Sequence, residues 1–452
     1  MEIARPAAVT RRRLLVRAGA AAAVLAAGPL VPRARPSSRA FPAASQFDAE
    51  VATAWLDHML GLVAGTPGFS PPVASRAFAY TGIALYEALV PGMAGFRSLA
   101  GSLPGLAELP AQGLNAAYHW PSVANAAVPA ILRRLFPTAG ADRLAAVDTL
   151  EATLADRIGL GLPAGIRDRS VRRGREVAAA VFDWSRGDGG HEGYARSFPP
   201  YVPPVGPGLW VPTPPAFQPA LQPFWGANRC IALTEGSAVP PGPHPAYSED
   251  PASAFFAEGL EVYDAVTGAT PEQVVIARFW SDDPGATSTP PGHSISITTQ
   301  VLRREHASLA AATEAYAKVG IAVSDAFVAC WHEKFVFNLL RPVTYLRAVV
   351  DPAWTPLLVT PPFPEYPSGH SVQSGAAFEV LTDLYGDAYA FVDHTHDARG
   401  FAPRSFGSFS EAGEEAAISR LYGGIHFRAA IENGLRQGRR IGQAVNALPF
   451  RE

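Results

Sequence analysis

The sequence has little cysteine and little lysine, and both shortages limit the kinds of site it can build. Cys230 and Cys330 are its only cysteines in 452 residues, which excludes a cysteine-based zinc site or an iron–sulfur cluster and allows one disulfide at most. The sequence leaves open whether the two cysteines pair. Lys318 and Lys334 are the only lysines among 37 basic residues, so a lysine inside an apolar segment stands out.

Beyond residue 40 the chain also lacks the excess of positive charge that nucleic-acid-binding surfaces carry. Residues 1–40 hold eight arginines and one glutamate, whereas the remainder holds 29 basic and 39 acidic residues, a net charge of −10. No nucleic-acid partner is therefore predicted. The apolar run at residues 18–31 is shorter than the roughly 20 residues that span a bilayer, and no other segment qualifies, so no membrane span is predicted.

The positive charge at the start of the chain has a simple explanation. Arg11-Arg12-Arg13 precedes two leucines and the alanine-rich run, an order that resembles a twin-arginine export signal. We expect a signal over residues 1–45, cleavage near residues 40–46, and a periplasmic or extracellular protein. Residues 46–452 are expected to form a single helical domain.

Helical periodicity dominates this domain, and signals for a sheet are absent. No sustained alternation of apolar and polar residues occurs, and neither a Gly-x-Gly-x-x-Gly nor a Gly-x-Ser-x-Gly motif is present, which disfavours Rossmann and α/β-hydrolase folds. An all-α fold with long Pro/Gly-rich loops is predicted, with helices over 51–63, 74–89, 144–158, 171–184, 252–266, 272–280, 294–306, 309–340, 372–385 and 411–446.

A proline-rich interval at 198–226 cannot form a continuous helix. Its aromatic residues would be costly to leave in water, so we expect an extended belt packed on the surface by Trp210, Phe217, Phe224 and Trp225.

The first candidate site element is a pair of cations in an apolar helical stretch. Lys334 and Arg341 are seven residues apart, so two helical turns would bring both side chains to one face. The alternative is a solvated basic face, and the pair alone does not decide between them.

The second element is the string Pro367-Ser368-Gly369-His370 at the start of a predicted helix. Free backbone N–H groups, a serine hydroxyl and the positive end of the helix dipole favour an oxyanion there. Ser368 could instead be a plain helix cap, but a cap does not explain the titratable ring of His370.

The third element adds a cation and a histidine. Arg420 and His426 flank Gly423-Gly424, whose small size allows close packing, and could reach one anion from different sides. Taken alone, His426 would be read as a structural histidine. Together the three elements supply three cations, backbone and hydroxyl donors and two histidines, as a tetrahedral oxyanion passing to a trigonal-bipyramidal state requires.

This three-part pattern, Lys-x6-Arg-Pro, Pro-Ser-Gly-His and Ser-Arg-x5-His, resembles the signature of vanadium-dependent haloperoxidases and of the type 2 phosphatidic acid phosphatase superfamily. It spans residues 334–426, within a site region at 331–426. Similarity to the soluble bacterial-type haloperoxidases extends to Trp331, to Pro361-Pro362-Phe363 and to the segments 279–283 and 289–291. The resemblance implies an all-helical fold of paired four-helix bundles.

The resemblance also implies residue roles. His370 would be the acid/base and Asp283 the carboxylate that orients it, with Asp282 as the alternative register. His426 would be the apical vanadium ligand. Vanadate oxygens would be bound by Lys334, Arg341, Ser368, Gly369 and Arg420, and a halide pocket similar to that of chloroperoxidases would be formed by Trp331, Pro361, Pro362 and Phe363.

The implied function is oxidation of halide by hydrogen peroxide to hypohalous acid, which then meets an organic acceptor. The alternative is an exported acid phosphatase that works through a phosphohistidine and needs no cofactor; a third possibility is an oxyanion-binding protein without catalysis. The family often has an aspartate four residues after the last histidine, whereas this chain has Ala430, a loss that weakens the phosphatase reading more. The halide, the organic acceptor and the oligomeric state stay open.

A further group of possible metal ligands, Asp393-His394-Thr395-His396-Asp397, follows the helix predicted at 372–385. Because the run sits in a Gly-rich stretch without regular ligand spacing, we expect a solvated loop.

Overall fold

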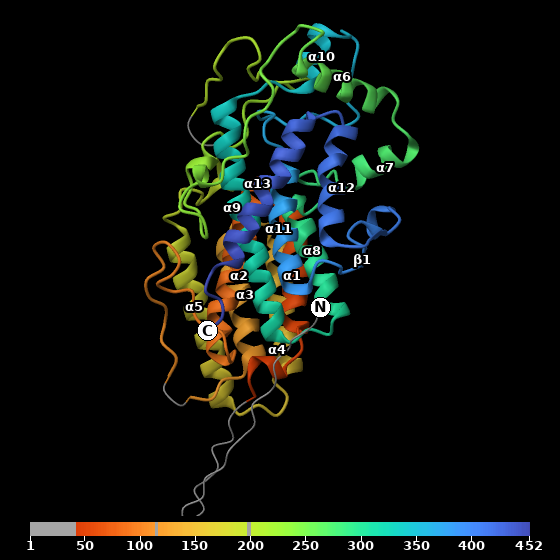
Figure 1. Ribbon diagram of the computed structural model, residues 1–452. Helices are drawn as coiled ribbons and strands as arrows, with labels where there is room; N and C mark the ends of the chain where they lie inside the picture. Colours follow the sequence, from red (N-terminus) through yellow and green to blue (C-terminus); the bar gives the residue numbers. More distant parts are fainter. Residues whose placement is uncertain (1–41, 114–115, 197–199) are drawn as a thin grey trace, which may run out of the picture. The chain divides into compact units, whose positions relative to one another are not determined.

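The computed structural model describes residues 42–113, 116–196 and 200–452, which fall in one compact unit. The predicted export signal lies almost entirely outside the described residues. The all-helical prediction is confirmed: the described part contains thirteen α-helices and one two-stranded ribbon (Figure 1).

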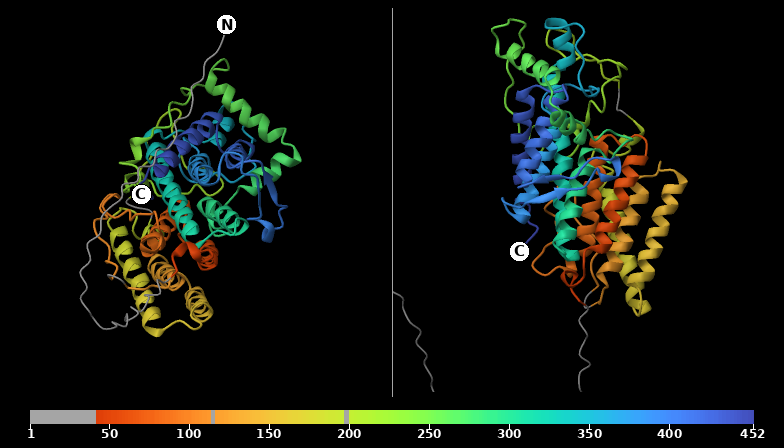
Figure 2. Two further views of the ribbon diagram at one scale, coloured as in Figure 1. Left: turned by 60° about the horizontal axis from the view of Figure 1, so that its bottom comes forward. Right: turned by 90° about the vertical axis from the view of Figure 1, so that its right-hand side faces the viewer.

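The helices form two groups along the chain. The first comprises α1 (Glu50–Gly65), α2 (Pro71–Leu89), α3 (Trp120–Leu135), α4 (Ala141–Ile158) and α5 (Ala164–Ser185). The second comprises α6 (Ala254–Thr267), α7 (Pro271–Phe279), α8 (Thr289–Arg304), α9 (Leu309–Phe337), α10 (Pro342–Val349), α11 (Gly369–Tyr385), α12 (Phe409–Tyr422) and α13 (Arg428–Asn446). The ribbon pairs β1 (Phe391–Asp393) antiparallel with β2 (Arg404–Phe406). The two views of Figure 2 show the first group, in red to yellow, beside the second, in green to blue.

Helix α9 joins the two groups because its surface is apolar nearly all round. It packs on α2 in the first group and on α8, α11 and α13 in the second. Close approach to α2 depends on Gly82 and Gly320, since a Cβ at Gly82 would lie 2.5 Å from the Tyr316 carbonyl and one at Gly320 would lie 2.9 Å from the Phe78 carbonyl. The buried core runs through this contact.

Two predicted helices differ from the observed ones, and α3 and α10 were not predicted. The helix expected at 309–340 ends at Phe337, where Asn338 adopts a left-handed conformation with φ 47°. The helix expected at 411–446 is two helices, α12 and α13, which are separated by a turn at Gly423 and Gly424. Helix α3 was not predicted, since Pro129 interrupts its sequence signal.

Only two of the four aromatic side chains that were expected to pack the proline-rich belt on the surface are buried. Trp210 and Trp225 are buried, whereas Phe217 and Phe224 are 62% and 41% exposed. The Trp210 N–H donates to the Asn338 carbonyl at 2.7 Å, so the belt crosses the chain where α9 ends.

The two cysteines are both buried and unpaired. No helix in the described ranges has the length and apolar character to cross a membrane.

Candidate active site

The predicted cation pair does not share a helix. Lys334 lies in the last turn of α9, and Arg341 lies beyond the left-handed Asn338, at the position that caps the start of α10. The break corrects the expectation of a continuous helical face. Both side chains nevertheless reach the segment that leads into α11.

Lys334 is fully buried, and its ammonium group donates hydrogen bonds only to main-chain oxygens. Its Nζ donates to the carbonyls of Pro364, Glu365 and Pro367 at 2.9, 2.9 and 2.5 Å. Burial, together with the charge of neighbouring Arg341, lowers the pKa of Lys334 to about 7. This lysine thus fixes the chain in front of Ser368 and adds positive potential from behind the cleft wall.

Arg341 and Arg420 are both buried, and neither uses all of its N–H groups in hydrogen bonds to the protein. Arg341 donates from Nε to the Phe363 carbonyl at 2.8 Å and from Nη1 to the Ile425 carbonyl at 2.9 Å, while its buried Nη2 has no partner. Arg420 donates to Ser419 Oγ and to the Ala277 carbonyl, both at 2.9 Å. Burial lowers the pKa of each to about 10, which leaves both charged at neutral pH.

Ser368 and Gly369 begin α11 as predicted. The Ser368 hydroxyl accepts from the Ser371 N–H at 3.4 Å, so the simple capping role is present in this structure. Gly434 lets α13 approach this end, because a Cβ there would lie 3.1 Å from the Ser368 carbonyl. Ser368 is buried behind the cleft, whereas Gly369 lines it.

His426 has a carboxylate partner that the sequence did not reveal. Its Nδ1 lies 2.8 Å from Glu365 Oε1, which also accepts from the Phe427 N–H at 2.8 Å. Glu365 therefore takes the place of the aspartate that is missing at Ala430. With its proton on Nδ1, His426 presents an unprotonated Nε2, which lies 3.3 Å from Arg341 Nη1.

The electrostatics around His426 are those of an uncompensated positive site. Burial, followed by Arg341 and Lys334, holds the pKa of His426 well below its usual value. Burial raises the pKa of Glu365 to about 8, so the carboxyl group itself resists ionisation. The shift of His426 has the sign that unpaired cations give, whereas that of Glu365 comes from burial, which outweighs the opposite effect of Lys334 and Arg341.

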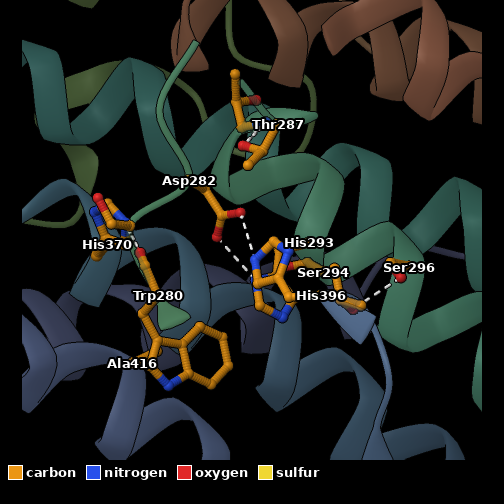
Figure 3. A network of polar contacts seen from close by, with 12 residues as sticks. Trp280, Asp282, Thr287, His293, Ser294, Ser296, His370, His396 and Ala416 are labelled. Atoms are coloured by element: carbon orange, nitrogen blue, oxygen red, sulfur yellow. Dashed lines mark hydrogen bonds and ion pairs between the residues drawn. The ribbon is translucent and has the colours of Figure 1, made fainter. Parts of the chain in front are cut away.

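His370 is oriented by a main-chain carbonyl, which corrects the expectation for Asp283. His370 Nε2 lies 2.9 Å from the Trp280 carbonyl, as Figure 3 shows. Asp283 is exposed and accepts from Ser281 Oγ at 3.1 Å instead. The neighbouring Asp282 is buried but turns towards His293 and His396, because these side chains lie on its inner side. Burial, followed by Arg420, lowers the pKa of His370.

A cleft of about 1210 Å³ opens onto this site. The predicted residues that line it are Trp331, Pro361, Pro362, Phe363, Gly369, His370, Arg420, His426 and Asp283, whereas Lys334, Arg341 and Ser368 lie behind its wall. The rings of Trp331 and Phe363 are 4.8 Å apart, and the Phe363 ring lies 5.1 Å from Lys334 Nζ and 4.8 Å from the Arg341 guanidinium. Phe363 thus separates these two cations from solvent.

The run at 393–397 is not a solvated loop throughout. Asp393 and His396 are buried, against the prediction. Asp393 contacts His293, and His396 contacts Asp282 (Figure 3). His394 and Asp397 are half exposed and pair with each other, as expected of a surface loop.

The site fits an oxyanion such as vanadate. Among the described residues no carboxylate lies within ion-pair distance of Lys334, Arg341 or Arg420, although all three are buried. Buried charges are normally paired, and Arg341 Nη2 lacks even a hydrogen-bond acceptor. An anion beside His426 Nε2 would supply the negative charge that the buried cations lack and the hydrogen-bond acceptor that Arg341 Nη2 lacks.

Comparison with known proteins gives a consistent result. The family model described as VCPO second helical-bundle domain matches residues 314–449. The vanadium chloroperoxidase of Curvularia inaequalis is 25% identical over 390 residues, which cover 71% of this chain; the chain spans 62% of that relative's length.

Two solved structures are similar over most of their length. One, the crystal structure of a bacterial vanadium-dependent iodoperoxidase, has 38% identity and a TM-score of 0.80, and covers 89% of this chain and 96% of its own. Another, a holo-type bacterial vanadium-dependent chloroperoxidase, has 17% identity and a TM-score of 0.65 over 85% of this chain and 93% of its own, which supports the fold. The 38% identity over nearly the whole of a solved relative shows that this chain belongs to the vanadium-dependent haloperoxidase family.

Proposed function

We propose that this protein is a vanadate-dependent haloperoxidase that oxidises halide with hydrogen peroxide to hypohalous acid. The observation that carries the proposal is the set of three buried cations, Lys334, Arg341 and Arg420, which have no carboxylate partner in the described chain and whose charges all act on His426. Arg341 Nη1 lies 3.3 Å from the unprotonated Nε2 of that histidine. A bound vanadate would be held by Arg341, Arg420 and the Gly369 N–H, with His426 Nε2 as its protein ligand and with the charge of Lys334 behind the cleft wall. When bound, it would supply a Lewis-acid centre for the activation of peroxide.

In this proposal His370 is the general base that accepts the proton released by hydrogen peroxide. Its Nε2 proton is held by the Trp280 carbonyl, which leaves Nδ1 free to accept one. Its lowered pKa keeps the ring neutral at physiological pH, the state that a general base requires. Arg420 contributes to the lowered pKa and thereby helps to keep His370 neutral and able to act as a base.

Glu365 and Phe363 prepare the surroundings. Glu365 holds His426 in the tautomer that exposes Nε2. Phe363 and Trp331 keep water from the buried cations, so their charges act in a medium of low polarity. A halide entering the cleft would meet this apolar wall, with Lys334 and Arg341 behind it.

Phosphate-ester hydrolysis through a phosphohistidine is the second candidate, and one observation favours it. The missing aspartate at Ala430 argued against a histidine nucleophile, but Glu365 supplies the carboxylate that such a nucleophile needs. The same geometry could therefore serve attack by His426 on phosphorus, with His370 as the acid.

The test is halide oxidation by the purified chain reconstituted with orthovanadate, beginning with iodide because the relative with 38% identity is an iodoperoxidase, and followed by bromide and chloride. We expect vanadate-dependent turnover that is lost in His426→Ala and kept in His306→Ala, which removes an exposed histidine. Hydrolysis of p-nitrophenyl phosphate by vanadate-free protein is assayed in parallel. Phosphatase activity without halide oxidation by vanadate-loaded protein would replace the first proposal by the second, and vanadate binding without either activity would leave an oxyanion-binding protein.

We also propose that residues 1–45 direct export by the twin-arginine route and that residues 46–452 form the mature single domain. The arginine triplet before the apolar run supports this. A fusion of residues 1–45 to a reporter should be exported, and replacement of Arg11, Arg12 and Arg13 by lysine should retain it in the cytoplasm. Export unaffected by that replacement would contradict the route.

A further inference from the structure

A second cluster of ionisable side chains lies beside the site and has no role in the proposed reaction. Asp282, His293, Asp393 and His396 are all at most 3% exposed. They come from the loop after α7, from α8, and from β1 and the turn that follows it. Figure 3 shows both imidazoles in front of the Asp282 carboxylate.

The contacts in this cluster divide the four residues into two kinds. Asp282 Oδ2 lies 2.8 Å from His293 Nδ1, and Asp282 Oδ1 lies 3.0 Å from His396 Nε2. Asp393 Oδ2 lies 2.7 Å from His293 Nε2 on the opposite side of that ring, and its Oδ1 accepts from the Thr395 N–H at 2.9 Å. Asp393 is thus a fixed acceptor that holds a proton on Nε2 and directs Nδ1 towards Asp282.

Hydrogen bonding accounts for Asp282 Oδ2, which lies 2.8 Å from His293 Nδ1, but not for Asp282 Oδ1. Asp282 Oδ1 is buried and has no hydrogen-bond partner, although His396 Nε2 is only 3.0 Å away, because that nitrogen and that oxygen are not aligned as donor and acceptor. An unpartnered buried acceptor costs about 1–3 kcal/mol. A nitrogen and an oxygen this close but not aligned with each other can both be directed at a third point.

A metal ion at that point would be within reach of all three side chains. Ligands bonded to a tetrahedral zinc at about 2.0–2.2 Å lie about 3.3–3.6 Å apart. The Asp282 oxygens lie 2.8 and 3.0 Å from the two imidazole nitrogens, so each contact would open by only about half an ångström around the ion. The ligand atoms of the three residues all lie within 4.8 Å of one another. The His293–Asp393 contact is the carboxylate–histidine pairing that orients metal-binding imidazoles.

The charge of the cluster leads to the same conclusion. Two buried carboxylates face two histidines. With a proton on each ring nitrogen, His293 carries one positive charge, which offsets only one of the two carboxylates. A divalent cation with two neutral imidazoles balances both carboxylates. Arg399 Nη1 lies 3.5 Å from both ring nitrogens of His396, but it forms no ion pair with Asp282 or Asp393 and so balances neither carboxylate directly.

We propose that Asp282, His293 and His396 bind a zinc ion, with Asp393 as the outer acceptor on His293. Two imidazoles and a carboxylate suit zinc among the common divalent metals. Only Asp282 of these residues lines the cleft, so the ion is structural. It ties the loop at 280–283 to the ribbon, and that loop carries the Trp280 carbonyl that orients His370. The Trp280 ring stacks on His293 with centroids 4.5 Å apart, so both are fixed together.

The experiment measures zinc directly and does not depend on vanadate or turnover. The full chain is purified without chelators, and its zinc is determined by elemental mass spectrometry. We expect one zinc ion per chain in the wild type and a loss of at least about tenfold in zinc affinity in His396→Ala. His394→Ala is the matched control, because this histidine is two residues away, 53% exposed and paired with Asp397; it should keep the ion.

A second measurement covers the case in which His396→Ala does not fold. Wild-type protein stripped with a chelator is refilled with cobalt, whose visible spectrum reports nitrogen and oxygen ligands in a tetrahedral site. Appearance of that spectrum, and its displacement by zinc, supports the proposal. Wild-type protein that contains no stoichiometric zinc and takes up neither zinc nor cobalt overturns it, as does an equal loss of zinc in His394→Ala.

Discussion

Replacement of Glu365 by glutamine separates the stability of this site from its function. Glu365 is fully buried and contacts His426 Nδ1 and the Phe427 N–H, both at 2.8 Å. A glutamine oxygen can still accept from both donors, so the fold should persist. Glutamine cannot ionise, so the carboxylate that would strengthen His426 Nε2 as a vanadium ligand cannot form.

The expected change in stability has a definite sign. Burial raises the pKa of Glu365 from 4.5 to about 8, so its charged form is disfavoured in the folded protein, and the free-energy penalty grows as pH rises from 4.5 to about 8. At neutral pH this penalty reaches up to about 3 kcal/mol, which Glu365→Gln removes. Part of the gain is offset, since the glutamine nitrogen at the position of Oε2 finds no acceptor. The variant should equal or exceed the wild type in stability at neutral pH and lose this advantage near pH 4.5.

The expected change in binding has the opposite sign for vanadate. Loss of an outer-shell partner typically weakens metal binding by about 10- to 100-fold, or about 1.4–2.7 kcal/mol. Sulfate, which forms no bond to nitrogen, should bind the variant about as well as the wild type at neutral pH, because Glu365, with its pKa raised to about 8, is largely uncharged there. Chemical denaturation across pH and calorimetric titration with both anions measure these quantities.

The matched control is Glu87→Gln in α2. Glu87 is also buried with a raised pKa and accepts from the Leu99 N–H, but it does not line the cleft. Its replacement should leave vanadate affinity unchanged. The reasoning is refuted if Glu365→Gln lowers stability at neutral pH while vanadate affinity stays the same.

Three further outcomes follow from the structure. Affinity for tungstate, whose charge is constant near neutral pH, should fall as pH rises above about 7, because binding must then return a proton to Lys334. Calorimetry across pH should show a shallower slope in Lys334→Met, where only the ionisation of Glu365 near pH 8 still opposes the anion, and an unchanged slope in that variant would contradict this. Gly434→Ala should lower vanadate affinity, because its Cβ would press within 3.1 Å of the Ser368 carbonyl and displace the start of α11; unchanged affinity would mean that this contact relaxes freely. Burial raises the pKa of Cys330 to about 11 and that of Cys230 further, so neither thiol should react with a disulfide reagent at pH 8 until the protein is unfolded, and rapid labelling of the folded protein would contradict the burial.

Local patterns in the sequence predict most of the fold. Helical spacing identified ten helical segments, and Ser368 was placed correctly at the start of α11. The break after Phe337 was missed, because an asparagine in the left-handed conformation leaves no apolar gap in an otherwise continuous helical pattern. Helix α3 was missed because Pro129 lies inside it. Sequence rules interpret a proline as a helix end, whereas the packing around α3 tolerates one.

The site was predictable as a set of residues but not as a set of contacts. His426 contacts Glu365, Lys334 and Arg341 lie near that carboxyl group, and Arg420 lines the same cleft as His426. Glu365 itself was overlooked, since it lies 61 residues before His426 and its role depends on tertiary contact. Residue spacing likewise could not show that Asp282 is turned inwards and Asp283 outwards.

A crystal structure of the protein loaded with orthovanadate tests the central claim most directly. The account predicts vanadium bonded to His426 Nε2, with Arg341 Nη2, Arg420 and the Gly369 N–H on its oxygens. Vanadate bound elsewhere, or held in the cleft without a nitrogen ligand from His426, would contradict it.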